Sequence, residues 1–244
     1  MIADPASHKP WLSQYHSDTP HHLPAAEYTN LAEFIEKMVE HYGELPAFSN
    51  FNTSLSFQTL LRRAKAFAAY LQQELGYQKG DRLALMMPNI LQYPVVLYAC
   101  YLSGIAVVNI NPLYTARELK HQLKDSGARG IVIVENFAHT FAQVQSELPQ
   151  VKDVRKLIQP FQIERALSYK EIMAKGMQLS FQPVEIAAND IAMLQYTGGT
   201  TGVAKGAMLS HANLLANIAQ VKAWVGSAIK EPSLICITPL PLYH

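Results

Sequence analysis

The sequence IAMLQYTGGTTGVAKG occupies residues 191–206 and joins an apolar strand to a glycine-rich loop. Residues 197–206 alone contain four glycines and three threonines. Glycine adopts positive φ at little cost and lets backbone N–H groups approach an anion without a Cβ in the way. Successive N–H groups in such a turn form an anion-binding concavity. We therefore expect residues 197–205 to hold phosphate groups.

Lys205 adds a full positive charge at the end of this loop, and the threonine hydroxyls add hydrogen-bond donors. One charge pair at ~4 Å in an effective dielectric constant of about 20 contributes on the order of 4 kcal/mol. An interaction of this size matters for polyphosphate binding and for charge that develops in a transition state. The pattern thus indicates a nucleotide-phosphate site with Lys205 among its working residues.

The loop differs from that of the common nucleoside triphosphatases. Their motif requires adjacent Gly-Lys-Ser/Thr at the start of a helix, whereas Lys205 is followed by Gly206. Residues 207–209 predict a second strand, and the next helix is expected to begin at Ser210 or His211. These features favour a strand–loop–strand cradle and disfavour a P-loop kinase or NTPase. A glycine-rich hairpin without a ligand is the other alternative, and the combination of glycines, threonines and Lys205 disfavours it.

Upstream of the loop, expected strands and helices alternate regularly. Strands are expected at residues 82–87, 105–110, 130–134 and 154–158, and helices at 90–102, from 115 onward and at 137–148. The box Thr115-Ala116-Arg117-Glu118 marks the start of the second of these helices. Strands separated by helices of about a dozen residues predict a mainly parallel sheet with helices on both faces. The predicted fold class is therefore α/β.

The N-terminal third is expected to precede this alternation as an arm and a helical segment. Residues 1–30 are rich in Pro, His and Ser and predict a surface arm. Asn30 is expected to cap the first long helix, and Ser56 the second. Residues 46–57 predict a hairpin between them, with its turn at 52–54.

The second half is expected to contain a connection followed by a new group of elements. Residues 160–189 are irregular, apart from one short helix with a capping box at 168–171. The new group begins at residue 190 with the strand of the loop, and residues 234–238 predict an apolar strand near the end.

Composition excludes some classes of partner. The chain has 244 residues, 49% of them hydrophobic and 16% charged, with a formal net charge of +1. Nucleic-acid binding usually requires a basic face, so a nucleic-acid partner is not expected. Cys100 and Cys236 lie far apart in apolar runs and are expected to be buried reduced thiols. Residues 1–24 lack the basic and apolar parts of a secretory signal, which favours a cytoplasmic location.

One uncharged stretch, residues 83–116, requires comparison with a membrane-spanning helix. A spanning helix needs about 20 predominantly apolar residues. This stretch is interrupted by prolines, asparagines and Gly104. It therefore predicts a buried strand, a buried helix and a second buried strand.

Four motifs resemble those of a known family. They are YTGGTTGVAKG at 196–206, DRLALMMPN at 81–89, NINPLY at 109–114 and PLPLYH at 239–244. They are similar to stretches of the adenylate-forming (AMP-binding) enzymes, in particular the bacterial long-chain fatty acyl-CoA synthetases. The resemblance begins near Trp11 and covers most of the chain, although the connection 156–183 is shorter than in those enzymes.

The resemblance implies roles for particular residues. The residues expected to bind the ATP β- and γ-phosphates are Thr197, Gly198, Gly199, Thr200, Thr201, Gly202 and Lys205. Lys205 and His244 are the candidate catalytic residues: Lys205 would stabilise the departing pyrophosphate, and His244 would lie near the acyl carboxylate. A carboxylate and ATP would give an acyl-adenylate and pyrophosphate, and coenzyme A would then form the thioester. Mg²⁺ is implied as a cofactor, with no ligand assigned in this chain.

The resemblance also implies a domain organisation of layered, mainly parallel sheets in a truncated large N-terminal domain. Residues 1–30 would form the arm and 31–244 an incomplete AMP-binding domain. Its first α/β subdomain would end near residue 185. Residues 190–244 would comprise the phosphate loop and the start of the second subdomain. The family's Mg²⁺-holding glutamate, ribose-binding aspartate and C-terminal catalytic lysine would follow His244. We therefore expect a truncated chain, a split-gene product or a partial sequence.

The expected partners are a fatty acid and coenzyme A as small-molecule substrates, together with a missing C-terminal half. Contact with the inner face of the membrane and a homodimer are left open. Two other functions remain as alternatives. One is a non-catalytic nucleotide- or partner-binding remnant, or one half of a split ligase. The other is a ligase for a different carboxylic acid.

Overall fold

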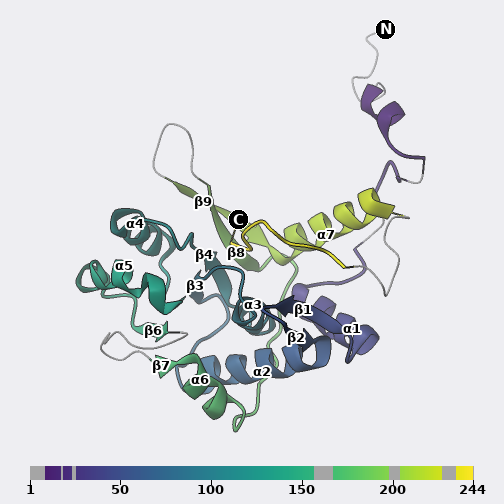
Figure 1. The fold of residues 1–244 in the computed structure, drawn as a ribbon. Helices are drawn as coiled ribbons and strands as arrows, with labels where there is room; N and C mark the ends of the chain where they lie inside the picture. Colours follow the sequence, from purple (N-terminus) through teal and green to yellow (C-terminus); the bar gives the residue numbers. More distant parts are fainter. Residues whose placement is uncertain are drawn as a thin grey trace.

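The computed structural model describes residues 9–17, 19–23, 26–156, 167–197, 204–226 and 235–243. A seven-stranded sheet forms the centre, with strand order β7-β6-β5-β3-β4-β8-β9 (Figure 1). Every neighbouring pair is parallel except β8 and β9, which are antiparallel. The strands are β3 Arg82–Met86, β4 Ala106–Asn109, β5 Gly130–Ile133, β6 Asp153–Lys156, β7 Leu167–Ser168, β8 Ile191–Thr197 and β9 Lys205–Ser210. The predicted α/β class with a mainly parallel sheet is confirmed.

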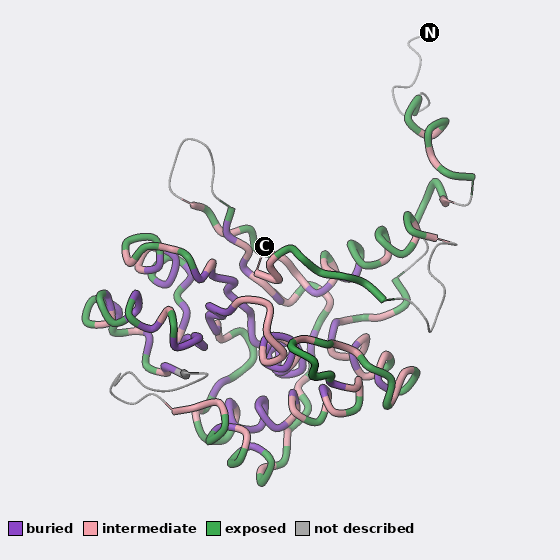
Figure 2. Tube along the Cα trace, viewed as in Figure 1, coloured by how far each residue is buried: buried purple, intermediate pink, exposed green. Residues whose placement is uncertain are grey.

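Helices cover both faces of this sheet, as the alternation predicts. The longer helices are α1 Leu31–Tyr42, α2 Phe57–Gln73, α3 Gln92–Leu102, α4 Ala116–Ser126, α6 Tyr169–Gly176 and α7 His211–Val225. Leu83 and Leu85 of β3 pack on the face that α1, α2, α3 and α6 cover. Ala84 and Met86 of the same strand pack on the opposite face, against α4 and α5 Ala138–Ala142. Figure 2 shows the central strands and the inner sides of these helices as buried. Because β3 is buried on both faces, its apolar run is continuous rather than alternating.

The expected helix starts are confirmed where a side chain caps the backbone. Asn30 and Ser56 accept hydrogen bonds from the third residue of the helices that follow them. Thr115 and Ser168 form complete capping boxes at α4 and α6. Ser210 caps α7, which begins at His211. These caps are local in sequence, so the sequence alone determines them.

Three predicted elements differ in the structure. The hairpin of β1 Pro46–Asn50 and β2 Thr53–Ser56 turns at Phe51 and Asn52 rather than at 52–54. Both turn residues have positive φ, 46° and 56°. Two positive φ values are the requirement of a two-residue hairpin turn whose twist matches the strands.

The helix expected at 137–148 is broken into short pieces: the 3-10 turn η2 Glu135–Phe137, helix α5, and the 3-10 turn η3 Gln145–Glu147. Backbone bonds of i to i+3 type join Phe141 to Val144 and Gln145 to Leu148. The buried residues Ala138, Phe141 and Val144 are spaced by three. A spacing of three suits 3-10 turns as well as it suits an α-helix.

The strand expected at 234–238 is absent from residues 235–238, the described part of that stretch. Ile235 and Ile237 are 87% and 85% exposed. Cys236 is also exposed, so the prediction of a buried thiol is wrong for Cys236 and confirmed for Cys100. An apolar run needs a neighbouring strand to become part of a sheet, and within the described chain none pairs with this one.

The sheet also contains two features that the sequence analysis did not specify. Strand β8 pairs with β4 in parallel and so belongs to the same sheet as the first strands. Strand β7 adds a short edge within the stretch expected to be an irregular connection. Within the described residues, no helix combines the length and the apolar character needed to cross a membrane.

Candidate functional site

The glycine-rich loop is held at both ends by a strand pair. Thr197, the last residue of β8, lies opposite Lys205, the first residue of β9, in the antiparallel register. Both residues are exposed. The predicted strand–loop–strand arrangement is therefore confirmed. The loop residues between them lie outside the described residues: Gly198, Gly199, Thr200, Thr201 and Gly202, together with Val203.

An aromatic side chain lies against the base of the loop. Tyr196 faces Gly206 across the hairpin. A Cβ at Gly206 would lie 2.8 and 2.9 Å from two carbons of the Tyr196 ring. Contacts below 3.0 Å require something to move. Glycine is therefore required at 206 for close packing. The loop glycines were inferred to have a different role, which is to let backbone N–H groups bind phosphate.

Helix α4 holds the same hairpin from the side. The Tyr196 hydroxyl donates a 2.5 Å hydrogen bond to Oδ2 of Asp125. His121 Nε2 lies 3.0 Å from the Ala204 carbonyl oxygen, an arrangement that requires the ring proton on Nε2. Burial, followed by the contact with Asp125, raises the pKa of Tyr196. Because Asp125 contacts β8 and His121 contacts the residue before β9, α4 fixes both ends of the loop.

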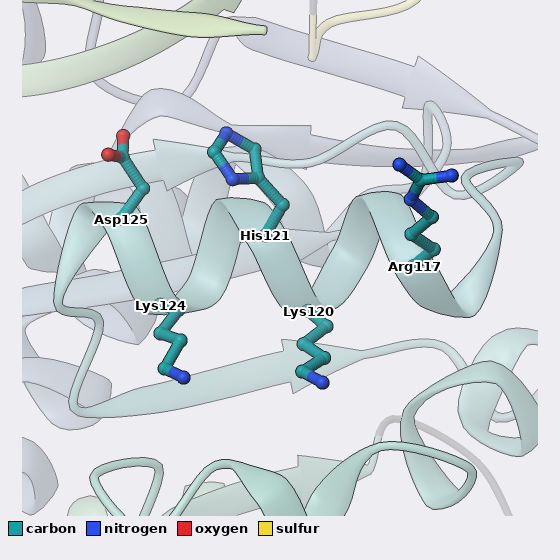
Figure 3. Close-up of a pocket in the computed structure, with 5 residues that line it drawn as sticks. All are labelled: Arg117, Lys120, His121, Lys124 and Asp125. Carbon is teal, nitrogen blue, oxygen red and sulfur yellow. The ribbon is translucent and has the colours of Figure 1, made fainter. Parts of the chain in front are cut away.

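A hollow beside α4 is lined by several cationic side chains. The hollow has a volume of about 440 Å³ and is lined by Arg117, Lys120, His121, Lys124 and Asp125. Figure 3 shows that all five side chains come from α4, with Lys120 and Lys124 directed away from the side that bears His121 and Asp125. Lys120 pairs with Glu147. The hollow is open to solvent, and two of its residues already support the hairpin.

A polar network lies at the carboxyl ends of β4 and β8. The Tyr93 hydroxyl lies 2.7 Å from Asn109 Oδ1, and Asn109 Nδ2 donates to Gln195 Oε1 at 3.0 Å. Gln122 of α4 donates to the Asn109 carbonyl oxygen at 2.6 Å. Burial is the main cause that raises the pKa of Tyr93, so its hydroxyl is a neutral donor at neutral pH. Asn109 and Tyr93 are buried, and these bonds satisfy their polar atoms.

The chain segment 238–243 crosses this network. Gln195 Nε2 donates to the Tyr243 carbonyl oxygen at 3.0 Å, and the Leu242 carbonyl oxygen accepts from Tyr93 at 2.9 Å. Asn89, which follows β3, bonds to the backbone at Leu240 and Leu242. His244 itself lies outside the described residues. Two stretches that the sequence analysis singled out are thus joined through Gln195, which is two residues before Thr197.

This meeting place lies at the carboxyl ends of the neighbouring strands β3, β4 and β8. Helix α3 leaves β3 toward one face, and α4 leaves β4 toward the other. Neighbouring parallel strands whose connections part in this way open a crevice at their carboxyl ends, where α/β proteins bind ligands. Asn89 follows β3 and Asn109 ends β4, and segment 238–243 is bonded to Asn89 directly and to Asn109 through Tyr93 and Gln195. Figure 1 shows the C-terminal segment passing the end of β8 near the hairpin.

Several residues of this site were not selected from the sequence. Asp125, His121, Asn89, Tyr93 and Gln195 act through contacts between elements that are far apart in sequence. Asn89, Asn109 and Tyr196 lay within the four quoted motifs, and Gln195 lay in the strand that leads into the loop, which was a usable signal. Among the described residues, no three His, Cys, Asp or Glu side chains gather as metal ligands.

Comparison with known proteins then identifies the family. The model of the family described as "AMP-binding enzyme" matches residues 35–244. The chain belongs to this family. It is 44% identical to a long-chain-fatty-acid–CoA ligase of Salmonella typhimurium over 97% of this chain, and 34% identical to the one of Bacillus subtilis over 98%. These matches confirm the resemblance stated from the motifs.

Solved structures agree with this assignment. A long-chain-fatty-acid–CoA ligase from Archaeoglobus fulgidus has a TM-score of 0.72 and 30% identity, over 87% of this chain and 42% of that one. An anthranilate CoA ligase with 21% identity has a TM-score of 0.70, which shows the shared fold. The chain spans only 46% of the Salmonella and Bacillus ligases.

Proposed function

We propose that this chain supplies the phosphate loop and the histidine-bearing segment of a fatty-acid-activating ligase. The observation that carries this proposal is the joining of segment 238–243 to Gln195, beside the base of the phosphate loop. The names of the most similar relatives support a long-chain fatty acid as the substrate. The reaction would run through an acyl-adenylate to an acyl-CoA.

Each step assigns work to residues of this chain. The loop N–H groups and Lys205 would bind the β- and γ-phosphates and stabilise the charge on the departing pyrophosphate. His244 would lie beside the fatty-acid carboxylate, and an oxygen of that carboxylate would attack the α-phosphorus and displace pyrophosphate. Coenzyme A sulfur would then replace AMP on the acyl carbon. Mg²⁺ would neutralise phosphate charge, and we assign it no ligand in this chain.

A second polypeptide segment would complete the site. The relatives have more than half of their length beyond the 46% that this chain covers. An apolar surface on α7 and residues 235–240 is available for that part. Its exposed members are Ile218, Val221, Trp224, Val225, Ile235, Ile237 and Leu240. Figure 2 shows α7 and the terminal segment largely exposed. Surfaces of this kind commonly mark protein interfaces. We name it the α7 surface.

The test compares the 244-residue chain with a whole-length protein. The chain is joined at residue 244 to the complementary part of the Salmonella typhimurium ligase, and pyrophosphate release from ATP and palmitate is measured. We expect release from the joined protein and negligible release from the 244-residue chain. Release by the short chain at the rate of the joined protein would contradict the proposal.

The fatty-acid assignment has its own test. The joined protein is given a series of fatty acids of different lengths together with aryl acids. We expect turnover of the long-chain acids. Turnover confined to aryl acids would contradict the fatty-acid assignment, although adenylation itself would stand.

A non-catalytic role in binding a nucleotide or a partner is the second candidate, and the exposed α7 surface favours it. ATP binding by the 244-residue chain, with no activity after joining, would support this role. The DNA downstream provides an inexpensive discriminating observation. An adjacent reading frame with the rest of the ligase would support a split enzyme, whereas unrelated sequence would support a remnant or a repurposed module.

A further inference from the structure

The segment 238–243 has no helix or strand in the described chain, yet its backbone is held by side chains from other elements. Asn89 makes three of these contacts. Its Oδ1 accepts from the Leu242 N–H at 2.7 Å. Its Nδ2 lies 2.8 Å from the Leu240 carbonyl oxygen and 3.2 Å from that of Thr238. The side-chain amide of Asn89 thus donates to and accepts from the backbone of residues 238–242, in the way that the backbone of a neighbouring strand would.

Asn89 is itself fixed in place. It follows β3 directly after Pro88, whose ring restricts the backbone there. Asn50, at the end of β1, donates from Nδ2 to the Asn89 carbonyl oxygen. The side chain of Asn89 is therefore carried by a loop that is anchored to a buried strand and to the N-terminal hairpin.

A second group of contacts holds the end of the segment. Gln195 Nε2 donates to the Tyr243 carbonyl oxygen, while its Oε1 accepts from Asn109. Tyr93 lies 2.9 Å from the Leu242 carbonyl oxygen and 2.7 Å from Asn109 Oδ1, so its hydroxyl proton is shared between the two acceptors. Tyr93 and Asn109 are 2% and 4% exposed. Because the amides of Gln195 and Asn109 are paired with each other, the orientation of each is determined.

We propose that Asn89 and Gln195 are positioning residues that hold the backbone before His244 at the carboxyl ends of β3 and β8. This inference rests on the proposed function, which places His244 beside the carboxylate. The two amides act on the backbone, and so they position the segment irrespective of its side chains. Gln195 has a further consequence, because it lies on the strand that leads into the phosphate loop. Gln195 therefore links the strand of that loop directly to the histidine-bearing segment, while Asn89 and Tyr93 hold the same segment from other elements.

If Asn89 positions the segment, its loss should change the kinetic constants in a different way from a loss of packing alone. Misplacing a reacting group by about 1 Å can lower a rate by roughly a hundredfold while the ground-state complex still forms. Loss of Asn89 should therefore reduce kcat more than it raises the KM for ATP. General destabilisation would instead lower the unfolding midpoint and reduce the amount of active protein.

The first experiment measures hydrogen exchange in the 244-residue chain. Asn89→Ala removes all three contacts, and Gln195→Glu keeps the acceptor for Asn109 but replaces the donor to Tyr243 with a carboxylate. We expect the Leu242 amide to exchange about tenfold faster or more in both variants. Gln92→Ala is the matched control, because Gln92 is a nearby half-buried amide whose side chain makes no hydrogen bond to the described residues.

Protection of the β3 amides serves as the check on folding in each variant. If β3 stays protected and the Leu242 amide exchanges as in the unaltered chain, the proposal is overturned. If Asn89→Ala does not fold, Gln195→Glu decides the outcome by the same measurement.

The second experiment uses the joined whole-length protein. We expect Asn89→Ala to lower kcat for pyrophosphate release by about tenfold or more, with the KM for ATP within about twofold. An effect no larger than that of Gln92→Ala would overturn the positioning role. A joined protein without activity in any variant would contradict the proposed function instead, and hydrogen exchange alone would then decide whether the two amides hold the segment.

Discussion

Gly206 has no side chain, and this allows the Tyr196 ring to pack directly against its backbone across the hairpin. An alanine at this position would place its Cβ 2.8 Å from the Tyr196 ring. The ring cannot swing aside freely, because its hydroxyl is bonded to Asp125. We expect Gly206→Ala to lower the free energy of unfolding by about 1–3 kcal/mol, measured by urea denaturation.

Removal of the ring is the control for this prediction. In a Tyr196→Leu background, Gly206→Ala should cost clearly less than in the unaltered chain, because the clash is absent. The two single variants and the double variant form a cycle that isolates the contact. Equal costs in both backgrounds would contradict the close-packing explanation.

His211 predicts a pH dependence of stability. It is 1% exposed, and its Nδ1 accepts from the Leu31 N–H at 3.2 Å, so only the neutral ring fits. Burial lowers the pKa of His211 to about 4, opposed by Asp190 and assisted by Lys79. In the unfolded chain its pKa is near 6.5, so the stabilising contribution is complete above that pH and is lost as the pH falls from 6.5 toward 4.

As the pH falls from 7 to 5, protonation of this histidine in the unfolded chain should therefore lower the free energy of unfolding by about 2 kcal/mol. His211→Gln retains an acceptor for Leu31 but does not titrate. We expect its urea midpoint to change less than that of the unaltered chain over the same interval. Equal changes in the two proteins would assign the pH dependence to other groups.

At the scale of single residues, the sequence was informative where a role depends on neighbours along the chain. Thr115 and Asn30 could be assigned as caps because their partners are three residues away. Asp125 and Gln195 could not be assigned, because their partners come from distant strands and segments. Cys236 shows the opposite failure: its apolar neighbours predicted burial, and nothing in the described structure covers it.

At the scale of elements, the hairpin β8–β9 depends on α4 for its position. We expect Tyr196→Phe to lower the free energy of unfolding by about 1 kcal/mol, because it removes the hydrogen bond to Asp125 but retains the ring. Urea denaturation measures the difference. Tyr28→Phe is the matched control, since the Tyr28 hydroxyl bonds the exposed carboxylate of the adjacent Glu27 at 2.8 Å.

The control should change stability very little, because an exposed contact between neighbours is readily replaced by water. Similar losses in Tyr28→Phe and Tyr196→Phe would contradict the idea that α4 supports the hairpin through this bond. The comparison also separates loss of a phenol in general from loss of this particular contact.

The elements also differ in how well the sequence determines them. Continuous apolar runs identified β3, β4 and β5 because those strands are buried on both faces. Apolar character also predicted a strand at 234–238, where the described residues form none. A run of apolar residues indicates a preference for burial, but only a neighbouring strand makes it part of a sheet.

At the scale of the whole molecule, the order of the strands could not be read from the sequence. The alternation predicted a parallel sheet, but the position of β3 between β5 and β4 depends on which face each helix covers. That choice brings Asn89, after β3, and Asn109, at the end of β4, to the carboxyl ends of neighbouring strands. The loop and the histidine-bearing segment were predicted as separate motifs, and the strand order explains why the strand that leads into the loop contacts residues 238–243.

The α7 surface gives the last prediction, which concerns the complementary half. Trp224 is 60% exposed on this surface, and its ring contacts Tyr15 edge-on at 5.0 Å between centroids. Trp11 is the other tryptophan of the chain, so Trp11→Phe leaves Trp224 as its sole tryptophan, and the spectrum of the added polypeptide alone is subtracted. We expect its fluorescence to shift to shorter wavelength when the complementary part of the Salmonella typhimurium ligase is added as a separate polypeptide, because burial removes water from the indole.

Val221→Lys provides the control, because this residue is 54% exposed and can be changed at little cost to the fold. A charge within an apolar interface must be desolvated on binding, so the titration should move to at least about tenfold higher concentrations of the added polypeptide. Lys37→Ala, on the exposed side of α1, should leave the titration unchanged. If Trp224 shifts equally in the Val221→Lys variant, the complementary half binds elsewhere and the α7 surface requires a different partner.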